Sequence, residues 1–126
     1  MTESITITIW GREFLLPIVY DSLSDGIISE NQIKAVDNWK MHLEWINKSK
    51  GVVEEYCKEA VSEDENNKKK NIIFSYIKPE RLYVTRDKLH PKIAIMCKYK
   101  YDLEHGLAIV FDVDGKIEVG IQDLVL

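Results

Sequence analysis

The spacing of hydrophobic residues changes twice along this chain, and this limits the folds open to it. Residues 5–10 alternate apolar and polar side chains, and an apolar segment at 14–20 follows Gly11, so together they predict a β-hairpin. Residues 30–61 repeat apolar side chains at three- and four-residue steps, which is typical of an amphipathic helix. From residue 81 onward the period returns to two. Because strands and helix are segregated along the chain, the pattern indicates an α+β fold.

The helix has a clear start and is too long to remain straight. Ser29 and Gln32 match a capping box, so the helix is expected to begin at Ser29. An unbroken helix over residues 30–61 would run about 48 Å, which is longer than a domain of this size is wide. Gly51 therefore predicts a break near residues 48–51. The apolar stripe on this helix comprises Ile33, Val36, Trp39, Leu43, Ile46, Val53, Cys57 and Ala60.

The second half of the chain predicts a short helix followed by strands. Residues 71–77 could form a strand, but the shared face of Ile73, Phe74 and Ile77 favours a two-turn helix. About four strands follow as an antiparallel β-meander, and Asp114-Gly115 predicts a two-residue hairpin turn of positive φ. The N-terminal hairpin either joins this sheet or packs beside it. The long helix, with its predicted break, is expected to pack on the sheet's apolar face.

Length and composition favour one domain that is not embedded in a membrane. The 126 residues, 45% of them hydrophobic, fit a single domain spanning residues 1–126. No apolar run approaches the roughly 20 residues that a membrane-spanning helix needs. The first ten residues lack the basic start and apolar block of a secretory signal. We therefore expect a cytoplasmic protein without a membrane partner.

The sequence carries no recognisable catalytic motif. Cys57 and Cys97 lie far apart, belong to no CxxC pair and fall on apolar faces, so they predict buried thiols, although one disulfide is arithmetically possible. A GxSxG nucleophile motif and a phosphate-binding glycine loop are both lacking. We therefore expect neither enzymatic activity nor a cofactor or metal.

Asp102, Glu104 and His105 form the densest polar cluster near a turn, which Gly106 closes. A carboxylate beside a histidine could serve in acid–base chemistry, bind a metal or contact a partner. Adjacent residues of an extended chain point to opposite faces, so Glu104 and His105 converge only if the turn folds them together. A capping role for this cluster is favoured over partner binding, and both over catalysis.

Nucleic-acid binding is the next alternative. Residues 98–101 alternate lysine with tyrosine, and Lys68–Lys70 add three positive charges, a combination that can bind single strands by stacking and charge. Tyr99 and Tyr101, however, share the inward register with Ile93 and Ile95. The pI of about 5.4 also argues against a nucleic-acid partner.

Charge is unevenly distributed along the chain, whose net charge is −4. Residues 1–65 carry 13 acids and 6 bases, residues 66–101 carry 2 acids and 10 bases, and residues 102–126 carry 6 acids and 1 base. This pattern fits either internal ion pairing or a face of one sign that attracts an opposite partner. The last hairpin is similarly ambiguous, because its acids suit either a solvated rim or an acidic docking surface. These acids are Asp112, Asp114, Glu118 and Asp123.

One family resemblance extends over nearly the whole chain. Its most specific part is the C-terminal block Asp102-x-Glu-His-Gly-Leu-x-x-x-Phe, followed by Gly115 and by Val119-Gly-x-Gln-Asp123. This pattern resembles a family of small bacterial domains of unknown function, whose members resemble immunity proteins encoded beside polymorphic or contact-dependent growth-inhibition toxins. The resemblance implies an α+β fold of sheet and helix, no known catalytic residues, and no particular toxin.

The leading hypothesis is an immunity protein that neutralises a cognate toxin by occluding its active surface. An acidic surface would complement a basic, nuclease-like toxin domain, and the protein itself would be a monomer or homodimer. The alternative is a structural or interaction module that neutralises no toxin. The residues expected to make electrostatic contact with the toxin are Asp102, Glu104, His105, Asp112, Asp114, Glu118 and Asp123.

Overall fold

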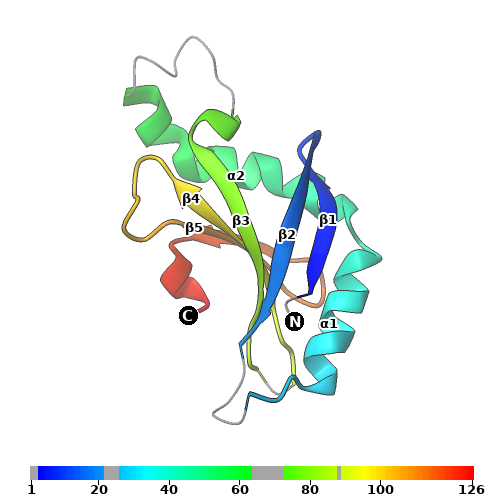
Figure 1. Cartoon of the computed structure of the whole chain (residues 1–126). Helices are drawn as coiled ribbons and strands as arrows, with labels where there is room; N and C mark the ends of the chain where they lie inside the picture. Colours follow the sequence, from blue (N-terminus) through cyan, green and yellow to red (C-terminus); the bar gives the residue numbers. More distant parts are fainter. Residues whose placement is uncertain (1–2, 22–25, 64–72, 88) are drawn as a thin grey trace.

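A computed structural model describes residues 3–21, 26–63, 73–87 and 89–126 of the chain. It forms one six-stranded sheet with two helices packed on one face (Figure 1). The strands are β1 (Ser4–Ile9), β2 (Arg12–Tyr20), β3 (Ile77–Val84), β4 (Ile93–Tyr99), β5 (Leu107–Phe111) and β6 (Ile117–Gly120). The helices are α1 (Glu30–Lys40) and α2 (Glu44–Glu63), and the short 3₁₀ turns are η1 (Ile73–Ser75) and η2 (Gln122–Leu124). The α+β class is confirmed.

The strands lie in chain order, β1 to β6, across the sheet. The predicted hairpin joins the C-terminal meander β3–β6 in one sheet, one of the two arrangements expected, so the whole sheet has six strands and not about four. Strands β2 and β3 pair in parallel through Ile18–Tyr20, while every other neighbouring pair is antiparallel. A parallel pair needs a long crossover, and α1 and α2 supply it. The sheet is therefore mixed.

The long helix breaks earlier than predicted. The capping box at Ser29 is confirmed, but the helix is interrupted at residues 41–43, and α2 continues through Gly51. Four side chains of α2 that are less than 1% exposed hold the segment around Gly51 against the sheet: Ile46, Ser49, Val53 and Cys57. Their burial outweighs the roughly 1 kcal/mol that a glycine costs inside a helix.

The buried stripe of α1 is also displaced from the predicted one. Its buried residues are Gln32, Ala35, Val36 and Trp39, whereas Ile33 is 48% exposed. Leu43, at the break, is also exposed. Gln32 is buried because its amide is fully used: it completes the capping box and donates to the Thr85 carbonyl oxygen at 3.1 Å.

The region before β3 differs from the predicted two-turn helix. Only the three residues of η1 are helical, and Ile77 already belongs to β3, while residues 71 and 72 lie outside the described residues. Pro79 lies inside β3, where the register with β4 shifts between Pro79 and Arg81. A bulge tolerates proline because it interrupts the ladder of hydrogen bonds that proline cannot join.

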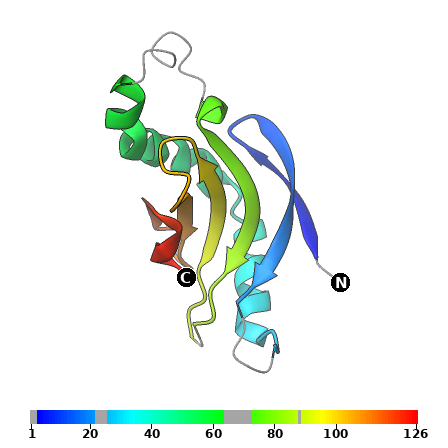
Figure 2. The ribbon, with the colours of Figure 1, turned by 60° about the vertical axis from the view of Figure 1, so that its left-hand side comes forward.

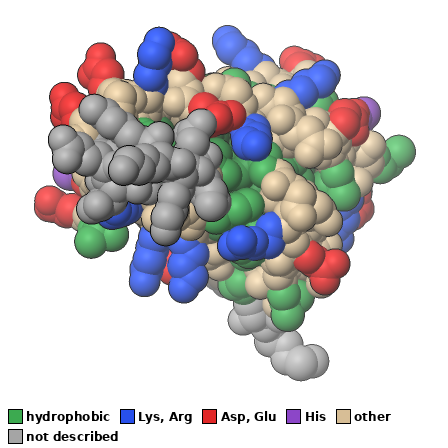
Figure 3. Space-filling view, turned by 90° about the horizontal axis from the view of Figure 1, so that it is seen from above, with side chains coloured by type: hydrophobic (Ala, Val, Ile, Leu, Met, Phe, Trp, Pro, Cys, Tyr) green, Lys and Arg blue, Asp and Glu red, His purple; other side chains and the backbone are tan. Residues whose placement is uncertain are grey.

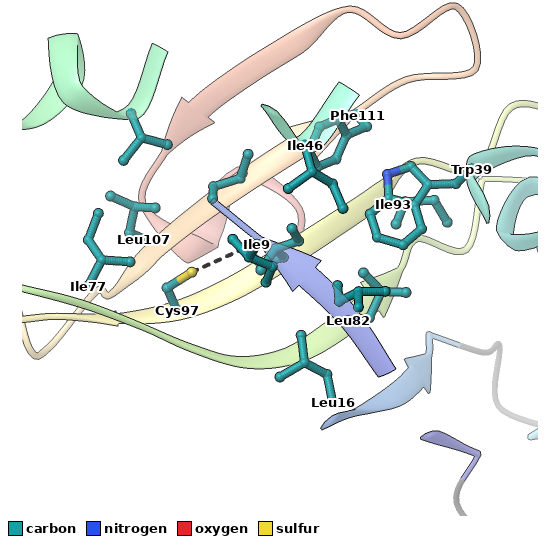
Figure 4. Close-up of a cluster of buried hydrophobic side chains, with 14 of the residues drawn as sticks. Ile9, Leu16, Trp39, Ile46, Ile77, Leu82, Ile93, Cys97, Leu107 and Phe111 are labelled. Carbon is teal, nitrogen blue, oxygen red and sulfur yellow. Dashed lines mark hydrogen bonds between the residues drawn. The ribbon is translucent and has the colours of Figure 1, made fainter. Parts of the chain in front are cut away.

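The main core fills the space between the sheet and the helices. Figure 4 shows its centre, where Ile9, Trp39, Leu82 and Phe111 from four different elements converge. Cys57 and Cys97 are both fully buried and unpaired in disulfides, which confirms the prediction of buried thiols. Burial raises the pKa of each thiol.

The opposite face of the sheet carries a second, smaller cluster. Ala94 and Met96, which alternate along β4 with the inward-facing Ile93 and Ile95, are fully buried, and Val125 from the C-terminal segment packs against their cluster. In Figure 2 the C-terminal segment lies on the side of the sheet away from α1 and α2. The chain end thus covers part of this second face of the sheet.

Candidate functional site

Five of the seven predicted contact residues lie in the turns at the two ends of β5, while Glu118 lies in β6 and Asp123 in η2. Asp102, Glu104 and His105 lie in the turn before β5, and Asp112 and Asp114 lie in the turn after it. The six residue-to-residue steps from Gly106 to Asp112 span about 20 Å at strand geometry. Figure 1 shows the two turns on opposite sides of the molecule. One continuous surface of all seven residues is therefore not formed.

Asp102 organises the first turn. Its Oδ1 accepts a hydrogen bond from the His105 backbone N–H at 3.2 Å and lies 3.0 Å from His105 Nδ1. The Gly106 N–H donates to the Asp102 carbonyl oxygen at 2.9 Å. These contacts close residues 102–106 into a compact loop, so the capping role expected for the cluster is present.

The C-terminal segment is joined to this turn through Gln122. Its backbone N–H donates to the His105 carbonyl oxygen at 3.0 Å, and its side-chain Nε2 donates to the Cys97 carbonyl oxygen at 3.1 Å. Gly106 makes this approach possible: its φ is +63°, and a Cβ there would lie 2.6 Å from Gln122 Nε2. The next residue, Asp123, is thereby brought close to the turn.

The carboxylates near His105 change the pKa of its side chain. The hydrogen bond and charge of Asp102 raise the pKa of the imidazole, and the carboxylates of Glu104 and Asp123 raise it further. Four of the seven predicted residues therefore gather at one place, although Asp123 is distant from the other three in sequence. We call this group the turn cluster: Asp102, Glu104, His105 and Asp123.

Leu103 is the feature of this site that the sequence analysis missed. It lies between Asp102 and Glu104 at the tip of the turn and is 75% exposed. The signal that could have identified it is an apolar residue in the middle of an otherwise polar turn, where no strand or helix face can bury it. An exposed leucine flanked by the carboxylates of Asp102 and Glu104 offers an apolar contact on an otherwise polar turn.

Aromatic residues lie beneath the turn cluster. Tyr99 meets Tyr101 edge-on with ring centroids 5.5 Å apart, and Tyr101 lies 6.0 Å from Tyr76. Tyr56 of α2 borders the same region, where burial, the Cys57 thiol and the Asp102 carboxylate together raise its pKa. The buried rings of Tyr76 and Tyr99 and the partly buried ring of Tyr101 pack together at the end of β4, next to the turn.

The tyrosines do not form a platform for nucleic-acid bases. Tyr99 is 5% exposed and Tyr101 packs against the main core, as the inward register predicted. Lys98 forms an ion pair with Glu80 at 3.7 Å. Lys68–Lys70 lie outside the described residues. The alternating lysine–tyrosine pattern thus belongs to the sheet, with its rings turned into the protein.

The second turn uses its acids differently. Asp112 Oδ1 accepts hydrogen bonds from the backbone N–H groups of Asp114 and Lys116, both at 2.9 Å. The Asp112 N–H donates to the Lys116 carbonyl oxygen, and Gly115 has a φ of +85°. The loop therefore contains three residues, not the predicted two-residue turn, and Gly115 is its one residue of positive φ among those described. The Asp112 carboxylate thus forms its hydrogen bonds within the turn itself.

An open groove of about 390 Å³ adjoins this second turn. Residues of α1, of the loop before β4 and of the β5–β6 turn line it: Asn31, Lys34, Ala35, Asn38, Leu89, Pro91, Val113 and Asp114. Lys34 is already paired with Glu30 at 3.3 Å, and both side chains are well exposed to solvent. The groove mixes polar and apolar groups and brings together no acid–base pair.

Within the described parts of the chain, no three or more His, Cys, Asp or Glu side chains are grouped to hold a metal ion. None of the helices described there has the length and apolar character needed to cross a membrane. Charges of opposite sign are interspersed around apolar side chains on the end of the molecule seen in Figure 3. The charge blocks of the sequence therefore do not give that end a single sign.

Comparison with known proteins gives one match. A family model described as "Domain of unknown function (DUF6985)" matches residues 1–126. No curated protein and no solved structure matches the chain.

Proposed function

This chain belongs to the DUF6985 family of domains of unknown function, and we propose that it acts as an immunity protein that binds and neutralises a cognate bacterial toxin in the cytoplasm. The observation that carries the proposal is the Asp102–Gly106 turn, which presents exposed Leu103 within the acidic turn cluster. The C-terminal block resembles a family of small domains whose members resemble immunity proteins, and this resemblance supports the same function.

Rigidity makes this turn suited to binding. A contact made by a flexible loop loses part of its energy to ordering that loop. Here Asp102 holds the backbone of His105, and Gln122 attaches the turn to β4 and η2. Leu103 is therefore presented in a fixed position. Its insertion into an apolar pocket of the partner would lose little further conformational entropy.

Carboxylates around Leu103 would supply selectivity and speed. Glu104 and Asp123 carry negative charge beside the anchor, and opposite charge on a partner accelerates encounter and disfavours acidic proteins. A nuclease-like toxin domain must bind phosphates and is therefore basic around its active site. Coverage of that site by the turn cluster would block substrate without any chemical step by this chain.

The test is binding and growth protection with the protein product of the neighbouring gene. Leu103→Ala should weaken binding about tenfold or more, because truncation of an interface anchor typically costs more than 1 kcal/mol. Glu104→Lys combined with Asp123→Lys should slow association and reduce its dependence on salt concentration. Asp102 is left intact in these variants because it holds the turn.

Matched controls come from the other end of β5. Asp114→Lys combined with Glu118→Lys makes the same change in net charge away from the turn cluster and should leave affinity nearly unchanged. Equal loss of binding in both double variants would reject the turn cluster as the contact surface. Tight binding without protection of the cell would instead favour an interaction module that neutralises no toxin.

A further inference from the structure

The N-terminal edge of the sheet carries unpaired backbone groups, and we infer that β1 pairs antiparallel with β1 of a second copy of this chain. Among the residues that the structure describes, strand β1 is the first in the sheet and pairs only with β2. Figure 2 shows it at the outer edge, on the side away from β6. This inference does not depend on the proposed function.

The register identifies which backbone groups of β1 face outward. The Ile18 N–H donates to the Glu3 carbonyl oxygen at 2.7 Å, so Glu3 faces β2. Because hydrogen-bonded positions alternate in an antiparallel pair, Ile5, Ile7 and Ile9 also face β2. The N–H and C=O groups of Ser4, Thr6 and Thr8 then point away from the sheet, three donors and three acceptors along one edge.

The edge lacks the features that normally prevent pairing. Natural edge strands are protected by charged side chains, proline, bulges or very short length. Strand β1 reads Ser-Ile-Thr-Ile-Thr-Ile over six residues, with no charge, proline or bulge. The opposite edge, β6, has four residues, includes Glu118 and leads directly into η2. The two edges therefore differ in how readily they accept another strand.

One register satisfies every outward group of β1. A two-fold axis at Thr6 sets Thr6 opposite Thr6 of the second copy and Ser4 opposite Thr8, which forms six backbone hydrogen bonds by the antiparallel rule. Hydroxyl side chains would then face each other on one side of the sheet, a favourable cross-strand pairing. On the core side, half-buried Ile5 would lie opposite Ile7 of the second copy.

Charge also fits a second copy. The molecule carries a net charge of −4, so two copies repel each other overall. Residues 4–8, which would form the strand pair in both copies, contain no charged side chain. A six-residue strand pair buries less than the roughly 1,200 Å² of a standard interface, so the dimer should be weak and transient. The sheets of the two copies would then form one continuous sheet across the dimer.

The experiment is sedimentation velocity of the whole chain from roughly 1 µM to 1 mM, with amide hydrogen exchange at both extremes. We expect the dimer fraction to rise with concentration and the Ser4, Thr6 and Thr8 amides to gain protection. Thr6→Pro removes an outward N–H that the monomer does not use and should abolish the dimer. Thr6→Val, which keeps the N–H, should retain it.

A second variant keeps the test decisive if proline disturbs the hairpin. Thr6→Lys combined with Thr8→Lys leaves the backbone intact and adds like charges to the edge, so it should also give a monomer. Unchanged thermal unfolding would show that both variants fold. A wild-type chain that is monomeric throughout, or a dimer that persists in the folded Thr6→Pro and double-lysine variants, would overturn the inference.

Discussion

At the scale of single residues, the turn cluster depends on two positions that perform different tasks. Asp102 fixes the turn by accepting hydrogen bonds, and Gly106 permits the close approach of Gln122. Neither residue provides the exposed anchor, which is Leu103. The residues that position this site are therefore separate from those proposed to touch a partner.

His105 should titrate above its ordinary pKa in the folded chain, because Asp102 stabilises the protonated imidazole. Asp102→Asn should lower this pKa, as measured by NMR titration of the imidazole, and Asp123→Asn should lower it less. The interaction stabilises the fold fully below the unfolded pKa of about 6.5 and is lost as pH rises through the higher folded pKa. A pKa that is the same in wild type and Asp102→Asn would contradict the geometry.

Gly106→Ala should destabilise the fold by roughly 2–4 kcal/mol, since alanine at positive φ is strained and its Cβ would meet Gln122 Nε2 and the Cys97 carbonyl oxygen. Gly51→Ala is the matched control. Gly51 lies in α2 with no heavy atom within 4 Å of an added Cβ, so alanine should stabilise by roughly 0.5–1 kcal/mol. Urea unfolding measures both, and the same sign for the two variants would refute the argument.

At the scale of elements, one side chain of the hairpin forms hydrogen bonds to α2 in addition to the shared apolar core. Trp10 has a φ of +48°, which is uncommon for a bulky residue. Its Nε1 donates to the Ile46 carbonyl oxygen at 3.0 Å and lies 3.2 Å from Ser49 Oγ, and its ring packs on Phe74 at 5.6 Å. These contacts offset the backbone strain and set where α2 starts on the sheet.

Trp10→Phe should cost roughly 1–2 kcal/mol of unfolding free energy, because the aromatic packing is largely kept while the indole hydrogen bonds are lost. Thr8→Ser, an exposed change on the same hairpin, should stay within about 0.5 kcal/mol of the wild type. Urea unfolding compares the two. A Trp10→Phe variant as stable as Thr8→Ser would show that these hydrogen bonds contribute nothing to holding α2.

At the scale of the whole molecule, the fold separates two interaction surfaces. The turn cluster lies at the β4–β5 end, while the free edge of β1 lies across the sheet, with β2 and β3 between β1 and β4. A dimer formed through β1 would leave both turn clusters accessible. Partner binding and self-pairing can thus occur together in the same molecule.

The sequence alone determined the features that depend on neighbouring residues. Alternation identified the hairpin and the strands β4 and β5, and the capping box located the start of α1, because these signals act within a few residues. The inward register of Tyr99 and the burial of Cys97 followed from the period-two alternation, and the burial of Cys57 followed from the helical stripe. Asp102 and His105 were recognised as a cluster because only three positions separate them.

Tertiary structure decided what depends on distant parts of the chain. The helix break moved to residues 41–43 because packing of α2 on the sheet outweighs the local preference of Gly51. The parallel pairing of β2 with β3 and the burial of Met96 under the C-terminal segment have no local signal. Asp123 joined the turn cluster, and Asp112 was separated from it, because β5 sets the distance between its two ends and Gln122 bridges chain segments far apart in sequence.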